Sequence, residues 1–199
     1  MRFILRAAGA PERLAILPGS FNPPTLAHIG LIEAAREHAD EILCVIPQVF
    51  PHKIFHGATL EQRLEMLKEA MPGANCSIAV SERGLFIDIA RECRDCYGLG
   101  PELQFVCGTD AAERILTWDY GRAGAIESML GEFSLLVAER QVRLEAPPAF
   151  TGRICRLDLA QGLDEISATD VRDRVRRNEP WEHLVPQSIA AQVRKIYGR

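Results

Sequence analysis

The chain has 199 residues, 47% of them hydrophobic and 25% charged, and its 23 basic and 27 acidic residues give a formal net charge of −4. This length and one continuous apolar pattern predict a single domain, residues 1–199, whose core needs neither disulfides nor structural metal. The slightly acidic balance argues against general affinity for nucleic acid, which depends largely on neutralising phosphates. No stretch approaches the roughly 18 apolar residues of a membrane span. The opening residues also lack the apolar length of a secretory signal, so we expect a cytoplasmic protein without a membrane partner.

The six cysteines do not form a recognisable metal or redox motif. Cys44, Cys107 and Cys155 lie inside apolar runs typical of strands, where a free thiol behaves as a small hydrophobe. Only Cys93 and Cys96 form a C-x-x-C pair, and no second pair or histidine pair stands at the spacing of a zinc finger. We therefore favour no metal or redox use for this pair, although the sequence does not say whether it has another role, and we expect no metal ligands among the protein side chains.

Apolar runs alternate with segments of helical periodicity, and glycines and prolines separate them. Six runs are typical of buried strands, the last of them short: residues 14–17, 42–46, 76–80, 103–107, 133–138 and 154–159. Helices are expected over residues 26–38, 60–71, 85–97, in two pieces within 109–130, and over 168–177 and 186–197. This alternation predicts an α/β fold, a Rossmann-like doubly wound parallel sheet of five to six strands with helices on both faces and a helical C-terminus. Ligands of such sheets bind beyond the carboxyl ends of the strands, so functional residues should follow the first, second and fourth strands.

The loop after the first strand combines a glycine, two prolines and a helix start in the run LPGSFNPPTLAHIG. Gly19 allows a sharp turn and a close approach to a ligand, and Pro23 and Pro24 hold the chain extended until the helix begins. Thr25 is then placed as the N-cap, with His28 in the first turn. The N–H groups and the positive dipole end of that turn attract anions, and His28 adds a donor for phosphate oxygens. The alternative is a capped helix with a surface histidine, which explains Thr25 but not the glycine and prolines.

The loop after the second strand carries His52 and Lys53, with Arg63 early in the next helix. Lysine and arginine at this edge of the sheet could bind phosphates, and arginine can do so bidentately. The alternative is a solvated loop, since an isolated Lys or Arg is usually exposed. His52 and His56 could suggest a metal pair, but a loop does not give them helical i, i+4 geometry, so we interpret them as surface histidines.

Two later segments also place polar residues at helix starts. Asp110, in a Gly-Thr-Asp run after the fourth strand, could accept hydrogen bonds from ribose hydroxyls, or Asp110 or Thr109 could simply cap the next helix. Ser167 with Asp170 three residues later approximates a capping box, and a row of arginines follows on the helix. The alternative is that Ser167, Thr169 and Arg172 surround a phosphate at this helix N-terminus.

The first loop resembles the signature G-x-F-x-P followed by H/T-x-G-H of the adenylyl- and cytidylyltransferase superfamily. Gly19, Phe21, Pro23, Thr25 and His28 match it in order, with an alanine in place of the glycine before His28. The run GSFNPPTLAH is especially similar to that of nicotinate/nicotinamide mononucleotide adenylyltransferases. The superfamily's second signature, I-S-S-T-x-x-R, matches residues 166–172 except for the alanine at 168. The Pro-His-Lys of residues 51–53, the Gly-x-Asp of residues 108–110 and a Trp shortly afterwards are similar to the same enzymes.

The resemblance implies an enzyme that transfers AMP from ATP to nicotinate or nicotinamide mononucleotide, releasing pyrophosphate, with Mg²⁺ accompanying the ATP. The implied catalytic residues are Thr25, His28, Lys53 and Arg172. The implied ATP-binding residues are Gly19, Ser20, Phe21, His28, Gly108, Asp110, Ile166, Ser167, Thr169 and Arg172. The implied acceptor-binding residues are Asn22, His52, Lys53 and Trp118. Trp118 would stack on the pyridine ring, although a buried core tryptophan is the competing interpretation.

Other functions remain open at this point. A related transferase acting on phosphopantetheine or another small phosphate is the second possibility among enzymes, and a nucleotide-binding module without turnover is the alternative from another class. The absent three-glycine fingerprint argues against an NAD-dependent dehydrogenase. The sequence does not choose between the acid and the amide acceptor, and residues 85–100 and 140–152 carry no functional interpretation.

Overall fold

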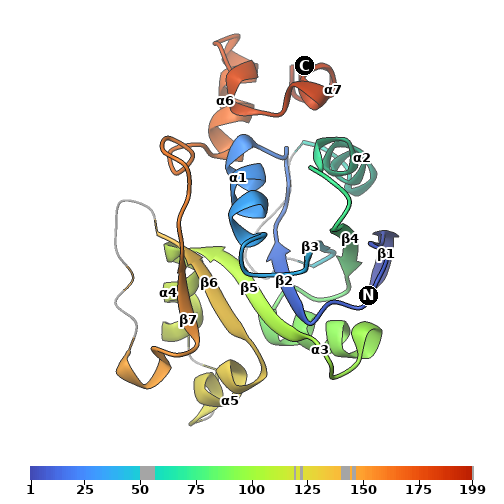
Figure 1. Ribbon diagram of the computed structural model, residues 1–199. Helices are drawn as coiled ribbons and strands as arrows, with labels where there is room; N and C mark the ends of the chain where they lie inside the picture. The colour runs from blue at the N-terminus through green and yellow to red at the C-terminus, as the bar shows by residue number, and fades with distance from the viewer. Residues whose placement is uncertain (50–56, 119, 122, 140–143, 145–146, 199) are drawn as a thin grey trace.

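The computed structural model describes residues 1–49, 57–118, 120–121, 123–139, 144 and 147–198, which form one open sheet flanked by helices (Figure 1). The strands are β1 (Arg2–Leu5), β2 (Arg13–Pro18), β3 (Glu41–Pro47), β4 (Cys76–Ser81), β5 (Glu102–Gly108), β6 (Ser134–Ala138) and β7 (Ile154–Leu157). The helices are α1 (Leu26–Ala35), α2 (Leu60–Ala70), α3 (Phe86–Tyr97), α4 (Thr109–Thr117), α5 (Ala125–Glu132), α6 (Ala168–Arg177) and α7 (Ala190–Tyr197). Short 3-10 turns cover Pro148–Phe150, Glu182–Leu184 and Gln187–Ile189.

The strand order is β1-β4-β3-β2-β5-β6-β7, and every pairing from β4 to β7 is parallel. Counted from β2, the parallel strands follow the order 3-2-1-4-5-6 of a doubly wound nucleotide-binding sheet. Ile16 of β2 lies between Leu43 of β3 and Phe105 of β5, at the point where the order reverses. The predicted fold class is confirmed, and in sheets of this strand order ligands bind beyond the carboxyl ends of the strands at the reversal, here β2 and β5.

The sheet has seven strands, one more than the five to six predicted. The additional strand, β1, pairs antiparallel with the outer strand β4, with Arg2 opposite Val80 and Leu5 opposite Ile78. The sequence analysis did not predict β1 for two reasons. It is an edge strand with no fully buried residue, and its four residues are too few for a distinct apolar run. A cationic side chain anchors it instead, since the Arg6 guanidinium lies 4.7 Å from the Phe3 ring centroid and 4.9 Å from that of Tyr97.

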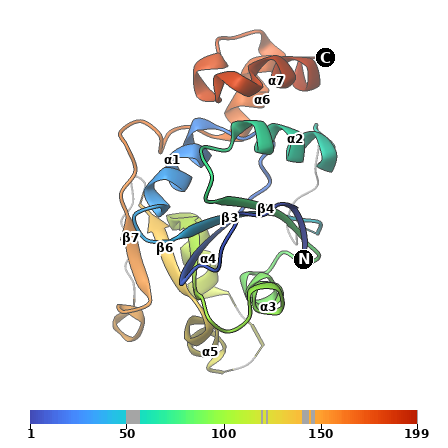
Figure 2. The same ribbon diagram turned by 45° about the vertical axis from the view of Figure 1, so that its right-hand side comes forward.

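The sheet is buried on both faces because alternate residues of each strand point into different cores. Ile16 and Val45 pack with α3, α4 and α5, whereas Leu17 and Cys44 pack with α1 and α2. Figures 1 and 2 show these two groups of helices on opposite sides of the sheet. Parallel strands covered in this way read as continuous apolar runs, which is why their positions could be predicted closely.

A third cluster attaches the C-terminal helices to the outer side of α2. Leu64 and Leu67 of α2 face the sheet, whereas Met66 of the same helix packs with Val171 of α6 and Val193 of α7. Accordingly, α6 and α7 lie beyond α1 and α2, away from α3 and α5 (Figure 2). The C-terminal segment therefore forms an extra layer whose main support is α2.

The cysteines are free, and most of them are buried. Burial raises the pKa of Cys93 and of Cys107 to about 12, which keeps both as thiols rather than the thiolates that bind metals. Cys155 is exposed on β7, so its interpretation as a buried small hydrophobe is wrong. The reason is that β7 is an edge strand whose outer residues face solvent. Among the described residues, no three His, Cys, Asp or Glu side chains gather as a metal site would require.

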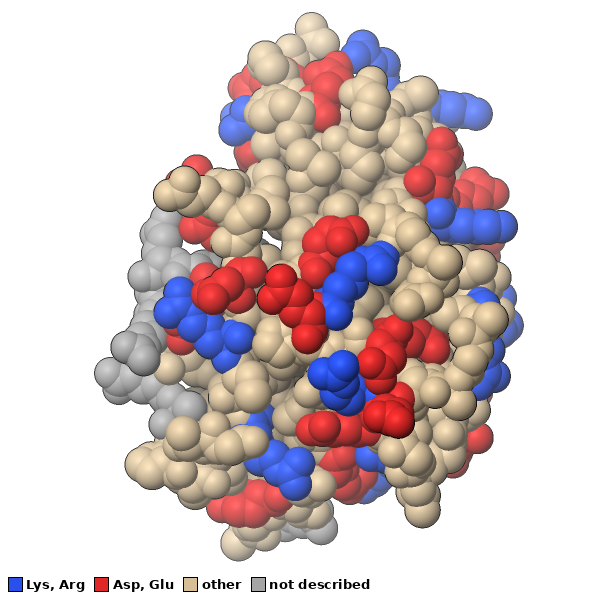
Figure 3. Space-filling model, in the orientation of Figure 1, with Lys and Arg blue, Asp and Glu red and all other residues tan. Residues whose placement is uncertain are grey.

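The surface seen in Figure 3 intermixes Lys and Arg with Asp and Glu, and neither sign covers a large continuous area of that face. This face offers no continuous basic surface of the kind a polyanion would need. Within the described part of the chain, every helix is too short or too polar to pass through a bilayer.

We predict that Met66→Ala lowers the free energy of unfolding by about 2–5 kcal/mol, because it leaves a cavity between α2 and the C-terminal layer. The neighbouring exposed Glu65→Ala is the control and should change it by no more than about 0.5 kcal/mol. Urea denaturation followed by circular dichroism measures both. An unchanged midpoint for Met66→Ala would show that this layer does not depend on α2.

Candidate active site

The loop from β2 to α1 turns at Phe21 rather than at Gly19. The Gly19 amide donates to the Val45 carbonyl at 2.9 Å, so Gly19 still continues the pairing of β2 with β3. The left-handed backbone conformation expected of a glycine falls instead on Phe21, whose φ is 45°. Gly19 is needed because a Cβ there would lie 2.9 Å from Cε2 of the Phe21 ring. The Phe21 ring is fully buried and lies against the His28 imidazole, with 4.9 Å between ring centroids.

Thr25 caps α1 as predicted, and His28 completes the cap in an unusual way. Nδ1 of His28 lies 3.0 Å from the backbone nitrogen of Thr25 and 2.8 Å from its hydroxyl. A backbone N–H can only donate, so Nδ1 is the acceptor and the neutral imidazole carries its proton on Nε2. His28 thus takes the place of the Glu or Gln of a capping box, and the cap itself selects the tautomer with an Nε2–H donor.

Two arginines from distant helices satisfy the carbonyls of this loop. Nη1 of Arg63, from α2, donates to the Ser20 carbonyl at 3.1 Å, and Nη1 of Arg172, from α6, donates to the Asn22 carbonyl at 2.6 Å. Arg63 is only 6% exposed, and burial lowers its pKa from the ordinary value. Buried carbonyls need donors, and charged donors make the stronger hydrogen bonds. Arg63 therefore holds the loop, a role that the sequence analysis did not assign to it.

The second signature lies at the start of α6 and is tied to the first. Ser167 accepts the Asp170 amide at 3.0 Å, which confirms the predicted cap, and Ile166 packs beside the third cluster. The two η nitrogens of Arg172 also donate within α6, to the Ala168 carbonyl and to the Thr169 hydroxyl, each at 3.1 Å. With its bond to Asn22, Arg172 brings together two helix N-termini that are far apart in the sequence.

The end of β5 supplies the third segment of the candidate site. Gly108 is the N-cap of α4 without a side-chain cap, so neither Thr109 nor Asp110 caps this helix. Thr109 is buried, whereas Asp110 is exposed in the first turn next to the carboxyl end of β2. Trp118 at the C-terminal end of α4 is 47% exposed, which rules out the core interpretation of its indole.

Some predicted residues fall outside this description, and some residues of the site escaped prediction. His52 and Lys53 lie outside the described residues, so their predicted roles stay predictions. Tyr197 was not predicted, yet its hydroxyl donates to Oδ1 of Asn22 at 2.6 Å. With the two residues 175 positions apart, no local sequence signal marks this contact.

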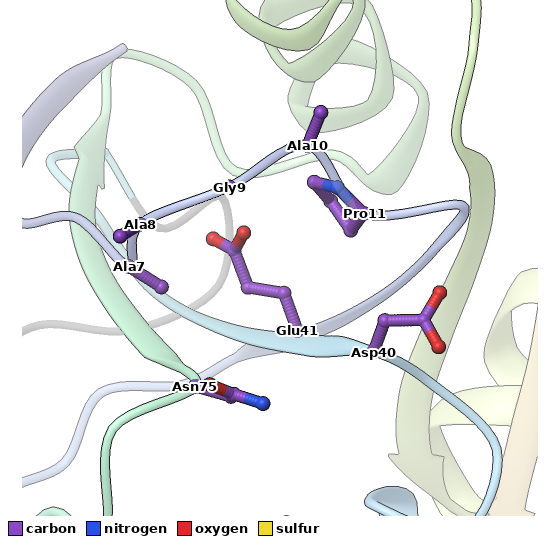
Figure 4. Close-up of a pocket in the computed structure, with 8 residues that line it drawn as sticks. All are labelled: Ala7, Ala8, Gly9, Ala10, Pro11, Asp40, Glu41 and Asn75. Atoms are coloured by element: carbon purple, nitrogen blue, oxygen red, sulfur yellow. The ribbon is translucent and has the colours of Figure 1, made fainter.

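A pocket of about 130 Å³ lies at the opposite end of the parallel strands, near the amino ends of β2 and β3 (Figure 4). Residues 7–11, Asp40, Glu41 and Asn75 line it. The buried Glu41 carboxylate accepts hydrogen bonds from the hydroxyls of Ser77 and Tyr97 at 2.5 Å each. Burial is the main cause that raises the pKa of Tyr97, and the hydrogen bond to Glu41 raises it further. This cluster fastens β3, β4 and α3 together and is separate from the candidate site at the carboxyl ends of the strands.

Taken together, a doubly wound sheet, a glycine loop at its switch point and two joined helix N-termini place the candidate site of this α/β protein at the carboxyl ends of the strands.

Comparison with known proteins identifies the family. The model of the cytidylyltransferase-like family matches residues 16–174. The chain is 30% identical over 202 residues to a probable nicotinate-nucleotide adenylyltransferase of Moorella thermoacetica, covering 92% of this chain and 90% of that protein. It is 42% identical over 190 residues to a phosphopantetheine adenylyltransferase of Symbiobacterium thermophilum, covering 93% and 96%. The chain therefore belongs to the cytidylyltransferase-like family, and it is a nucleotidyltransferase.

A solved structure shares the fold. Plasmodium falciparum nicotinic acid mononucleotide adenylyltransferase, complexed with NaAD, superimposes with a TM-score of 0.70 at 16% sequence identity. The alignment covers 92% of this chain and 96% of that one. At this identity the likeness concerns the fold.

We predict that Gly19→Ala costs about 1–3 kcal/mol of stability, because the new methyl group displaces the Phe21 ring. Turnover should fall as well, since that ring packs on His28. Gly131→Ala in α5 is the matched control, because its Cβ would meet nothing within 4 Å and alanine favours a helix. Urea unfolding and initial rates measure both variants. Equal stability of the two would contradict the packing of Phe21 on Gly19.

Proposed function

We propose that this chain transfers AMP from ATP to nicotinate or nicotinamide mononucleotide and releases pyrophosphate. The observation that carries the proposal is the 2.6 Å hydrogen bond from Arg172 to the Asn22 carbonyl, since it joins the two phosphate-binding signatures. The relatives named nicotinate-nucleotide adenylyltransferases, which the chain matches over about nine-tenths of its length, support the same activity.

In the proposed reaction, a phosphate oxygen of the mononucleotide attacks the α-phosphorus of ATP. The bond from that phosphorus to the α–β bridging oxygen breaks, and pyrophosphate leaves with the electron pair. The reaction needs no protein nucleophile, so catalysis consists of positioning the reactants and stabilising phosphate charge. Nε2–H of His28 would donate to the α- and β-phosphates while Thr25 holds the ring. Lys53 and Arg172 would hold the leaving pyrophosphate.

The remaining ATP contacts would come from segments that follow the carboxyl ends of the strands. Asp110 would accept hydrogen bonds from the ribose, beside Gly108, and the start of α6 would face the phosphates. We propose that Mg²⁺ enters with ATP and neutralises phosphate charge. Its ligands would be mainly phosphate oxygens of ATP and water.

The proposed acceptor follows from Trp118. Its half-exposed indole offers an aromatic face on which a pyridine ring could stack. Pantetheine has no aromatic ring to use it. The second candidate, transfer of AMP to phosphopantetheine, is favoured by the 42% identity to the Symbiobacterium thermophilum relative.

We also propose that the chain works in the cytoplasm. Its six cysteines are free, and such thiols persist in a reducing compartment.

Pyrophosphate release from MgATP, measured with nicotinate mononucleotide, nicotinamide mononucleotide and phosphopantetheine in parallel, tests the proposal. We expect release with a pyridine mononucleotide and none with phosphopantetheine. The opposite pattern would establish the second candidate. No release with any of the three would favour a nucleotide-binding module without turnover.

We predict that His28→Ala lowers kcat by about 10²–10³-fold while leaving the protein folded, because one donor to the developing phosphate charge is lost. His183→Ala, on an exposed position of the C-terminal layer, is the control and should keep its turnover. Initial rates at saturating MgATP give kcat for both variants, and circular dichroism shows whether each is folded. A folded His28→Ala enzyme with near-normal turnover would refute the mechanism.

A further inference from the structure

Residue 22 of the glycine loop is held at two points by the C-terminal layer. Arg172 of α6 donates to the Asn22 backbone carbonyl, and Tyr197 of α7 donates to its side-chain oxygen, both at 2.6 Å. Asn22 is 4% exposed and Tyr197 3%. Burial raises the pKa of Tyr197, so the phenol remains a protonated donor at neutral pH. The orientation of Asn22 is therefore set jointly by two different helices.

Tyr197 also contacts the segment in front of α2. A Cβ added to Gly57 would lie 2.8 Å from Cε1 of the Tyr197 ring, and the φ of Gly57 is +114°. The ring thus packs directly on Gly57. Both the positive φ and this close contact require a glycine at that position. One side chain of α7 consequently touches the glycine loop through its hydroxyl and the start of α2 through its ring.

The chain between Asn22 and the cap of α1 is stiff. Pro23 and Pro24 are both buried, and proline fixes φ within narrow limits. A shift of Asn22 is therefore passed on to Thr25, whose amide and hydroxyl hold Nδ1 of His28. Phe21, the preceding neighbour of Asn22, packs on the same imidazole, with 4.9 Å between the ring centroids.

We propose that Tyr197 is a positioning residue for His28, acting through Asn22 and the two prolines. The inference rests on the proposed function, in which His28 donates to the phosphates of ATP. Tyr197 itself touches no reacting atom. Its hydroxyl keeps the glycine loop in the arrangement that aims the Nε2–H of His28.

The first test observes His28 without any substrate. Tyr197→Phe removes the hydroxyl and leaves the ring on Gly57. The matched control, Tyr97→Phe, removes a hydroxyl that donates to the buried Glu41 near the amino ends of the strands. The ¹H and ¹⁵N imidazole resonances of His28, assigned with His28→Ala, should move in Tyr197→Phe and stay in place in Tyr97→Phe. Unmoved resonances in Tyr197→Phe would overturn the proposal.

The second test is kinetic. Tyr197→Phe should lower kcat by about 10-fold or more, since small displacements of a catalytic group have large effects, and leave KM for MgATP within about twofold. Tyr97→Phe should keep its kcat although it too loses a hydrogen bond. Added to His28→Ala, Tyr197→Phe should lower kcat no further, because residues acting through one group are not additive. An equal loss in both backgrounds, or a normal kcat for Tyr197→Phe alone, would overturn the proposal.

Two further outcomes remain decisive. If Tyr197→Phe fails to fold, Asn22→Ala breaks the same bond from the loop side, and the His28 resonances are compared in that variant with the same expectation. If no acceptor supports pyrophosphate release, the proposed function fails, while the resonances still decide whether Tyr197 positions His28.

Discussion

The site depends on the need of buried carbonyl groups for hydrogen-bond donors. Residues 21–25 of the loop between β2 and α1 are buried, and most loops avoid such a position because buried carbonyls need donors from the protein. Ser20 and Asn22 receive guanidinium donors from α2 and α6 instead. Without those arginines, burial of the loop would leave polar atoms unsatisfied, so the helices that carry them are part of the site.

This requirement explains why the C-terminal helices lie where they do. The helix α2 is apolar on two sides, with Leu67 facing the sheet and Met66 facing the third cluster. The C-terminal layer docks on that second side and thereby brings Arg172 to the glycine loop. Packing energy is thus coupled to the geometry of the glycine loop, although α6 and α7 contribute little to the two cores that sandwich the sheet.

Capping and function were posed as alternatives for Thr25 and Ser167. Both residues cap their helices, and the proposed function uses these caps. The cap of α1 places the His28 ring and determines which nitrogen carries the proton. The cap of α6 begins the helix that carries Arg172. A helix N-terminus binds anions through the N–H groups that its cap organises, so a good cap is a precondition of the proposed chemistry. At α4 the capping interpretation of Asp110 is excluded, because Gly108 is the N-cap and no side chain caps this helix.

The sequence by itself determined the fold class, the six parallel strands, the start of α1 at Thr25 and the two signatures. Buried parallel strands and capped helices leave local patterns, and the match to family signatures added the proposed activity. Only the tertiary structure revealed the edge strand β1, the exposure of Cys155 and Trp118, and the hydrogen bonds of Arg63 and Tyr197 to the glycine loop. These depend on contacts between residues far apart in the chain, such as Asn22 with Tyr197, and no local periodicity encodes which distant side chain will satisfy a given carbonyl or amide.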